Sequence, residues 1–132
     1  MNPIFQFKSL QKKYDYLAPD TSEIRLLPEF DGAGLCHCTL KPETVSAAIK
    51  HKTVDEIWYC LSGEGEIWQS RNDEGEIKKF TRDNSFTIPV GNSFQFRNTG
   101  TQNLCMLIVT TPKWPGTEEA EAVKPYWELV KQ

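Results

Sequence analysis

Two residues in the middle of the chain, His51 and Glu56, are of types that carry out acid–base chemistry or bind a metal ion. Glu56 opens the segment Glu-Ile-Trp-Tyr-Cys-Leu (56–61), whose β-branched and aromatic residues are typical of a strand covered on both faces. A carboxyl group that faces an apolar interior needs a cation, a metal or a proton. We therefore expect His51 and Glu56 to form a polar dyad in a pocket, as an acid–base pair or as part of a metal site.

Other residues are candidates for the lining of this pocket. Trp58 shares the strand face of Glu56, where it either stacks on a ring-shaped ligand or fills the core. One polar dyad in an otherwise apolar cavity is typical of a small-molecule site. The alternation along 35–40 leaves open whether His37 faces inward or outward. The predicted ligand-binding residues are His37, Ile49, Thr53, Trp58, Phe94 and Phe96.

The elements that must position these residues are short strands separated by turn signals, which indicates an all-β sandwich or barrel. The expected strands are 23–27, 35–40, 45–51, 56–61, 64–70, 76–80, 85–89, 93–98 and 103–110, with a tight turn at Pro89-Val90-Gly91. Residues 9–17 form either a short helix or an arm. At the other end, Thr117 is expected to cap a short helix over 118–123, and Trp114 and Trp127 are expected to be packing anchors.

Composition favours one domain spanning 1–132, with a core at about 20–112. The net charge of −3 and the lack of a basic block argue against nucleic-acid binding. The longest strictly apolar run, 104–109, has six residues and cannot span a membrane, and the N-terminus lacks the features of a signal peptide. We expect a cytoplasmic protein whose four cysteines are reduced.

Two stretches resemble the motifs of the cupin superfamily. The first family motif is Gly, five residues, His-x-His, three or four residues, Glu, six residues and Gly; here these positions hold Glu43, Ile49, His51, Glu56 and Gly63. The second motif is Gly, five residues, Pro-x-Gly, two residues, His, three residues and Asn. Here Asp83, Pro89, Gly91, Phe94 and Asn98 stand at these positions.

The resemblance implies a cupin-type double-stranded β-helix, or jelly-roll barrel, here with an N-terminal arm and a short C-terminal helical tail. It also implies a homodimer. The usual metal ligands of the family correspond to Ile49, His51, Glu56 and Phe94. The resemblance implies that Ile49 and Phe94, which cannot bind a metal, make the rest of the cavity apolar. We therefore expect no metal or other cofactor.

The resemblance leaves three functions open. The leading one is binding of a sugar-like or small organic metabolite, with His51 and Glu56 as catalytic residues of a metal-independent acid–base enzyme related in mechanism to isomerases and epimerases. The second is a metal-dependent oxygenase or isomerase that uses His51, Glu56 and His37. The third is a ligand-sensing or structural module without catalysis.

Overall fold

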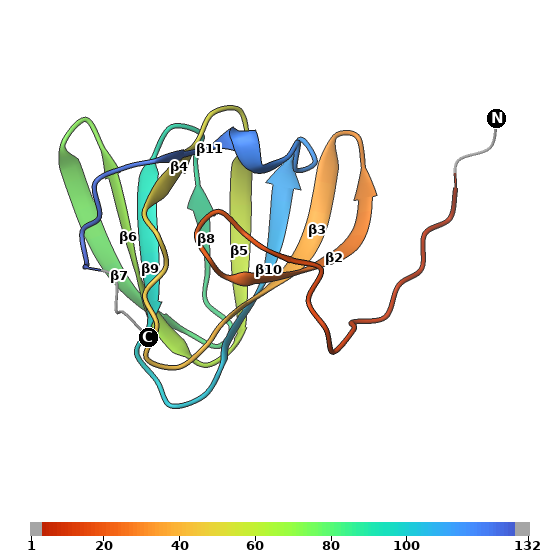
Figure 1. Cartoon of the computed structure of the whole chain (residues 1–132), viewed down its shortest axis with the longest axis horizontal. Coiled ribbons are helices and arrows are strands. Elements are labelled where there is room, and N and C mark those ends of the chain that lie inside the picture. Colours follow the sequence, from red (N-terminus) through yellow and green to blue (C-terminus); the bar gives the residue numbers. More distant parts are fainter. Residues whose placement is uncertain (1–3, 129–132) are drawn as a thin grey trace.

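The computed structural model describes residues 4–128, which form two antiparallel β-sheets facing each other (Figure 1). The strand orders are β1-β2-β3-β10-β5-β8 in the first sheet and β11-β4-β9-β6-β7 in the second. The strands are β1 (Tyr16–Leu17), β2 (Glu23–Phe30), β3 (Ala33–Leu40), β4 (Ile49–His51), β5 (Asp55–Ser62), β6 (Glu64–Arg71), β7 (Glu74–Thr81), β8 (Ser85–Ile88), β9 (Ser93–Asn98), β10 (Leu104–Thr111) and β11 (Ala120–Ala122).

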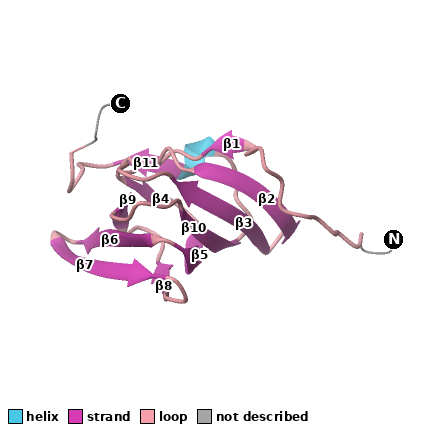
Figure 2. Ribbon diagram, turned by 90° about the horizontal axis from the view of Figure 1, so that it is seen from below, coloured by secondary structure: helices cyan, strands magenta, loops and turns pink. Residues whose placement is uncertain are grey.

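The chain crosses between the sheets at most connections after β3, as in a jelly roll. Figure 2, turned by 90°, shows β6 and β7 on the opposite side of the molecule from β2 and β3. The prediction of an all-β, cupin-type jelly roll is therefore confirmed. The inner faces of the sheets supply the core, in which Trp58, Phe94 and Phe96 pack edge to face with ring centroids 4.9–6.0 Å apart.

Strand β5 differs from its predicted environment. Buried Glu56, Trp58 and Cys60 alternate with exposed neighbours, so only one face of the strand is covered. The outward residues Ile57 and Tyr59 are 52% and 42% exposed. The apolar composition of 56–61 wrongly indicated two covered faces, because hydrophobic residues also occupy the outer face of this sheet.

The strand predicted over 45–51 is shorter in the structure. Only Ile49–His51 pairs as β4, while Val45 makes a single bridge to Arg97. Between Val45 and Ile49 the backbone changes its hydrogen-bond partner: Ser46 N donates to Phe96 O, and Ala47 N donates to Asp20 O. At the other edge, β2 continues past the predicted end at Leu27 to Phe30, with an irregular register between Leu26 and Glu29.

The helix predicted over 118–123 is wrong. The tail contains a single 3₁₀ turn at Thr117–Glu119, followed by β11, which pairs with β4. Pairing of Ala120 with His51 and of Ala122 with Ile49 satisfies backbone groups of β4, whereas a helix over 118–123 would have fewer than two turns and little stability of its own. Glu119 is thereby buried beside the turn that precedes β5.

The predicted turn at Pro89-Val90-Gly91 is present. Asn92 N donates to Pro89 O at 3.1 Å, and Gly91 has φ of +86°, a backbone conformation that residues with a Cβ rarely adopt.

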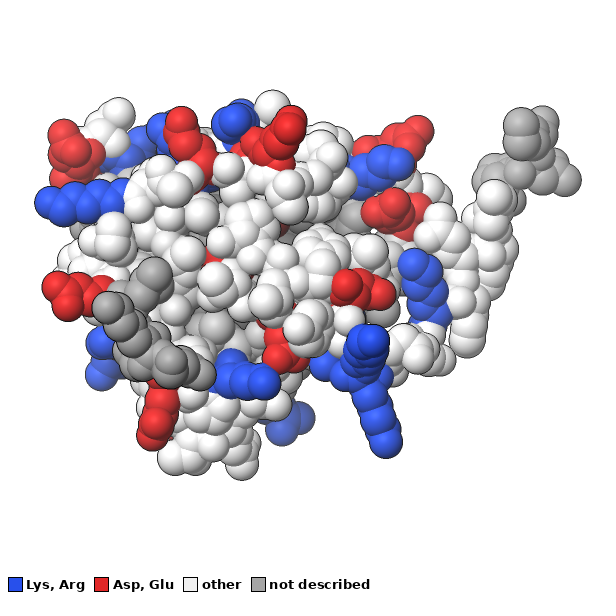
Figure 3. Space-filling view, in the orientation of Figure 1, with Lys and Arg blue, Asp and Glu red and all other residues white. Residues whose placement is uncertain are grey.

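Residues 9–15 form an extended arm rather than a helix, and the arm leads into β1 (Figure 1). On the face drawn in Figure 3, basic and acidic side chains are interspersed. No helix in the described part of the chain is long and apolar enough to cross a membrane.

Candidate functional site

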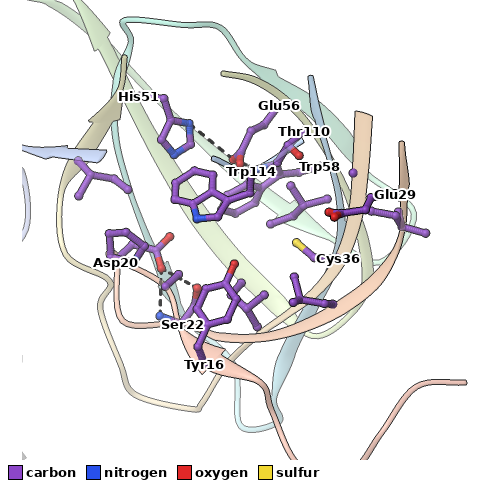
Figure 4. Close-up of a pocket in the computed structure, with 18 of the residues that line it drawn as sticks. Tyr16, Asp20, Ser22, Glu29, Cys36, His51, Glu56, Trp58, Thr110 and Trp114 are labelled. Atoms are coloured by element: carbon purple, nitrogen blue, oxygen red, sulfur yellow. Dashed lines mark hydrogen bonds and ion pairs between the residues drawn. The ribbon is translucent and has the colours of Figure 1, made fainter. Parts of the chain in front are cut away.

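A cavity lies between the two sheets, and its lining includes both His51 and Glu56 (Figure 4). Strands β1 to β5, β9 and β10 contribute to the lining, together with the turn before β2 and Trp114 of the tail. The free volume is about 50 Å³. A water molecule needs about 10–15 Å³ on this measure, so the cavity has room for a few waters or for a ligand of a few heavy atoms.

His51 enters the cavity from β4 and is held there by aromatic rings. Its imidazole packs edge-on against Phe94 and Trp114, with ring centroids 5.2 Å and 5.3 Å away. The residue is only 4% exposed, and burial lowers the pKa of His51 to about 4, against a smaller opposing effect of Glu119. His51 is therefore neutral near pH 7. Its buried Nδ1 atom has no hydrogen-bond partner among the described residues.

Glu56 enters the cavity from β5, between β8 and β10, where it pairs with Ile88 and Thr110. Its Oε1 accepts one hydrogen bond, from Trp58 Nε1 at 2.9 Å. Burial raises the pKa of Glu56 to about 8; the Trp58 bond lowers it, and Asp20 and Glu119 add to the rise. The carboxyl group is therefore mostly protonated at neutral pH.

The two groups face each other without bonding directly. His51 Nδ1 and Glu56 Oε1 are 4.0 Å apart, beyond hydrogen-bond distance (Figure 4). Since both are neutral at pH 7, they do not form an ion pair. A ligand atom placed between them can receive a proton from the carboxyl group and give one to the imidazole, which is what general acid–base catalysis requires.

A second carboxyl group lies at the other end of the cavity. Asp20 Oδ1 accepts hydrogen bonds from Ser22 N at 3.0 Å and Ser22 Oγ at 2.6 Å, and the carboxyl group points into the cavity (Figure 4). Burial nevertheless raises the pKa of Asp20. The thiol of Cys36 also lines the cavity, and burial raises its pKa to about 12, so it is not a thiolate nucleophile at neutral pH.

The structure gathers five of the predicted site residues around this cavity. His51 and Glu56 are joined there by Ile49, Trp58 and Phe94, with Ile49 directly paired to Phe94 across β4 and β9.

The other three predicted ligand-binding residues do not line the cavity. His37 alternates with Cys36 and Cys38, which face inward, and so lies on the outer side of β3, paired with Arg25 and Leu107. Phe96 is fully buried in the core beside Trp58. Thr53 lies in the exposed turn before β5, where it donates to Glu119 from its backbone N and its hydroxyl.

Sequence reasoning missed Tyr16, Asp20 and Trp114, all of which line the cavity. Asp20 belongs to a segment recognisable only as a turn, although the pattern Asp-x-Ser is typical of an aspartate that accepts bonds from its own turn. Trp114 was expected to be a packing anchor; its ring instead stands against His51 at the cavity (Figure 4). Neither position has a sequence signal that links it to β4 or β5.

The residues present do not fit a mononuclear metal centre. Such centres take three or four protein ligands, whereas the positions beside His51 and Glu56 are held by the buried side chains Ile49 and Phe94. Within residues 4–128, no group of three or more His, Cys, Asp and Glu side chains is arranged to hold a metal ion. The chemistry considered below therefore uses side chains alone.

Comparisons with known proteins agree with this fold. A family model described as "Cupin domain" matches residues 36–110, and no curated protein matches the chain. An uncharacterized conserved protein with a double-stranded beta-helix domain from Klebsiella pneumoniae superposes with a TM-score of 0.69 at 13% identity, over 92% of this chain and 100% of the other.

Two oxalate decarboxylases also resemble the chain. The enzyme from Bacillus subtilis gives a TM-score of 0.69 at 11% identity, over 81% of this chain and 29% of the other. The formate complex from Lactobacillus farciminis gives 0.67 at 13% identity, over 77% and 31%. The chain thus spans about a third of each decarboxylase, and at these identities the likeness concerns the fold alone.

Proposed function

The chain belongs to the cupin family, and we propose that its cavity binds a small, partly apolar metabolite between His51 and Glu56 and catalyses proton transfer on it without a metal. The observation that carries this proposal is the position of the buried His51 Nδ1 in the cavity, 4.0 Å from the Glu56 carboxyl and without a hydrogen-bond partner in the described chain; the similarly unpartnered Nδ1 of His37 lies outside the cavity. A buried polar atom left without a partner costs about 1–3 kcal/mol. A bound ligand that bonds to Nδ1 removes this cost.

The protonation states assign a role to each side chain. Glu56, with a pKa of about 8, holds a proton at pH 7 and donates it, while neutral His51 accepts one. Trp58 keeps the carboxyl group oriented through its hydrogen bond to Oε1, and the rings of Phe94 and Trp114 fix the imidazole plane. A proton shift between two atoms of one small molecule is the reaction that this arrangement supports best.

Oxalate, the substrate named for the decarboxylase neighbours, is not the ligand that we propose. The residues lining the cavity include no Lys or Arg, and Asp20, Glu29 and Glu56 are acidic. A dianion would therefore meet carboxyl groups with no cation to balance its charge. Sugar-like molecules and small amines are better matched to this lining than acids or phosphates.

The test uses the fact that the chain contains only two histidines. In ¹H–¹⁵N NMR spectra of the imidazoles, a compound that enters the cavity should shift the His51 signals and leave those of His37, on the outer side of β3, unchanged. A panel of small polyols, hydroxyketones, amines and carboxylic acids should be screened in this way. Binding compounds should then be incubated in D₂O to detect proton exchange, which is expected to vanish in His51→Gln. If no compound shifts His51 selectively, the ligand-site proposal is wrong.

We also propose that the protein is a homodimer formed through the outer face of the six-stranded sheet. Ile57 and Tyr59 are exposed on this face, and the arm beside β2 exposes Ile4, Phe5 and Phe7 by 83–86%. Apolar surface of this kind is typical of an interface. Light scattering should give twice the chain mass, and Ile57→Lys should reduce it to one chain mass; a monomeric wild type would overturn the proposal.

A further inference from the structure

The Asp, Glu, Lys and Arg side chains that line the described cavity are all acidic. Asp20 and Glu56 are 5% and 7% exposed, and Glu29 stands at the exposed side of the cavity (Figure 4). Among residues 4–128, no Lys or Arg lines the same cavity, and none of its three carboxyl groups has a basic partner there within this range. A buried carboxylate is stabilised by a cation, and the described lining does not contain one.

The walls of the same cavity are aromatic. Tyr16, Trp58, Phe94 and Trp114 all line it. The faces of such rings attract ammonium groups, and recognition of small ammonium ligands by several rings and a carboxylate is common in proteins. The buried His51 Nδ1 without a partner adds an acceptor that can take an N–H or O–H of such a ligand.

We propose that the ligand of this cavity is a small organic ammonium ion of about the size of ethanolamine, seated among Tyr16, Trp58 and Trp114 with Glu56 as its counter-ion. This inference rests on the binding part of the proposed function, not on Glu56 as the proton donor, and it narrows the ligand to one chemical class. The free volume of about 50 Å³ limits the ligand to a few heavy atoms unless it extends past Trp114. Asp20, held by Ser22, supplies a second acceptor at the far end.

Binding of a cation must be linked to loss of a proton from Glu56. The groups that face Glu56 are His51 on β4, Tyr16 on β1, Cys36 on β3, Asp20 before β2 and Glu119 in the tail; these are neutral or acidic. An ammonium ion would be the first positive charge in this set, and it favours the carboxylate. The affinity for the cation should therefore increase about tenfold for each unit by which the pH is raised toward 8, and it should level off at higher pH.

The experiment compares ammonium ligands with neutral molecules of the same shape. Ethanolamine is paired with ethylene glycol, and choline with 3,3-dimethyl-1-butanol, in isothermal titration calorimetry at pH 6.5 and pH 8. At least one cation is expected to bind ten times more tightly than its neutral partner and more tightly at the higher pH. Measurements in two buffers of different ionisation enthalpy should show release of a proton at pH 6.5.

Three variants test which side chains bind the cation. Glu56→Gln should remove the preference for the cation, and Trp114→Leu at the edge of the cavity should weaken binding at least fivefold; the second variant keeps the test valid if the first does not fold. Glu76→Gln, an exposed acid on β7, is the matched control and should bind as wild type does.

Other outcomes would overturn the inference. It is wrong if the neutral partners bind as tightly as the cations, if no cation binds, or if Glu56→Gln binds cations as wild type does. If in addition a neutral compound shifts the His51 signals, the proposed function stands and only the ligand class is wrong. If nothing shifts them, both proposals fail.

Discussion

Glu56 and Glu119 have similarly small exposed fractions, 7% and 6%, but Glu56 lies deep between the sheets whereas Glu119 lies close to the surface, and the pKa values of the two carboxyl groups shift in opposite directions. Glu119 accepts bonds from Thr53 N, Thr53 Oγ1 and Val54 N, and these donors lower its pKa against the effect of burial. Glu56 has only the Trp58 bond, and burial raises its pKa to about 8. The charge of each acid is therefore set by two things together, the depth of its burial and the number of donors aimed at its carboxyl group.

The difference separates a structural site from a site left open for a ligand. Glu119 ties the tail to the turn that precedes β5, so its charge is satisfied within the fold. Glu56 and His51 each keep bonding capacity unused inside the protein. The predictions below test this contrast, beginning with the largest expected effect.

Glu119→Ala should lower the free energy of unfolding by about 3 kcal/mol, because it leaves the amides of Thr53 and Val54 without their charged acceptor. Urea unfolding at pH 7 measures this change. Glu121→Ala is the control, since Glu121 is exposed and only forms an ion pair with Lys50. A loss at Glu119 no larger than that at Glu121 would show that the carboxylate does not hold the tail.

Between pH 6.5 and pH 8, wild-type stability should fall by about 2 kcal/mol. The folded-state pKa of Glu56, about 8, lies above the unfolded value of 4.5, so the unfolded state loses its proton first and stability is lost as pH rises through this window. His51, whose pKa is lowered to about 4, acts below pH 6.5, where its contribution to stability falls with falling pH and offsets the gain that Glu56 continues to give down to pH 4.5. Unfolding of wild type and Glu56→Gln at both pH values checks the assignment, and an equal pH dependence in the variant would refute it.

Trp58→Phe should raise the pKa of Glu56 further, because it removes the only hydrogen bond that the carboxyl group accepts within the described part of the chain. The variant also loses packing, so overall stability is not the readout. The readout is the pH midpoint of the stability change, which should move to higher pH. A midpoint that stays in place would mean that the Trp58 bond has no influence on the charge of Glu56.

The smallest expected effect concerns metal content. Purified wild-type protein should hold well under one equivalent of transition metal, because Ile49 and Phe94 replace two ligands beside His51 and Glu56. Elemental analysis measures this, with the double variant Ile49→His/Phe94→His as the comparison that should gain metal. About one equivalent in wild type, lost in His51→Ala, would contradict the account.

The sequence predicted most of the fold because strand periodicity and turn residues are local signals. The Pro89-Val90-Gly91 turn follows from such signals, whereas the placement of His51 beside Glu56 in the pocket follows from the resemblance to the cupin motifs. The tail could not be predicted in this way: the acidic residues after Thr117 favour a helix locally, and the pairing of β11 with β4 overrides that preference.

The missing part of the site has a similar cause. Asp20 and Trp114 reach the cavity from segments about 30 and 60 residues away from His51, through contacts that no local pattern contains. Residues along β3 alternate between the inner and the outer face of the sheet. The face on which His37 lies is decided only by the register of β3 with β2 and β10. The two glutamates could not be told apart either, since donors such as Val54 N are backbone groups placed by the tertiary structure.

The most direct test is the same isosteric change at both glutamates. Melting temperatures of Glu56→Gln and Glu119→Gln should be measured against wild type at pH 8. Glu56→Gln is expected to melt at or above the wild-type temperature, because it removes a buried charge that lacks donors, whereas Glu119→Gln should melt well below it. If both variants melt far below wild type, Glu56 is a structural residue like Glu119, and the cavity is not a site held open for a ligand.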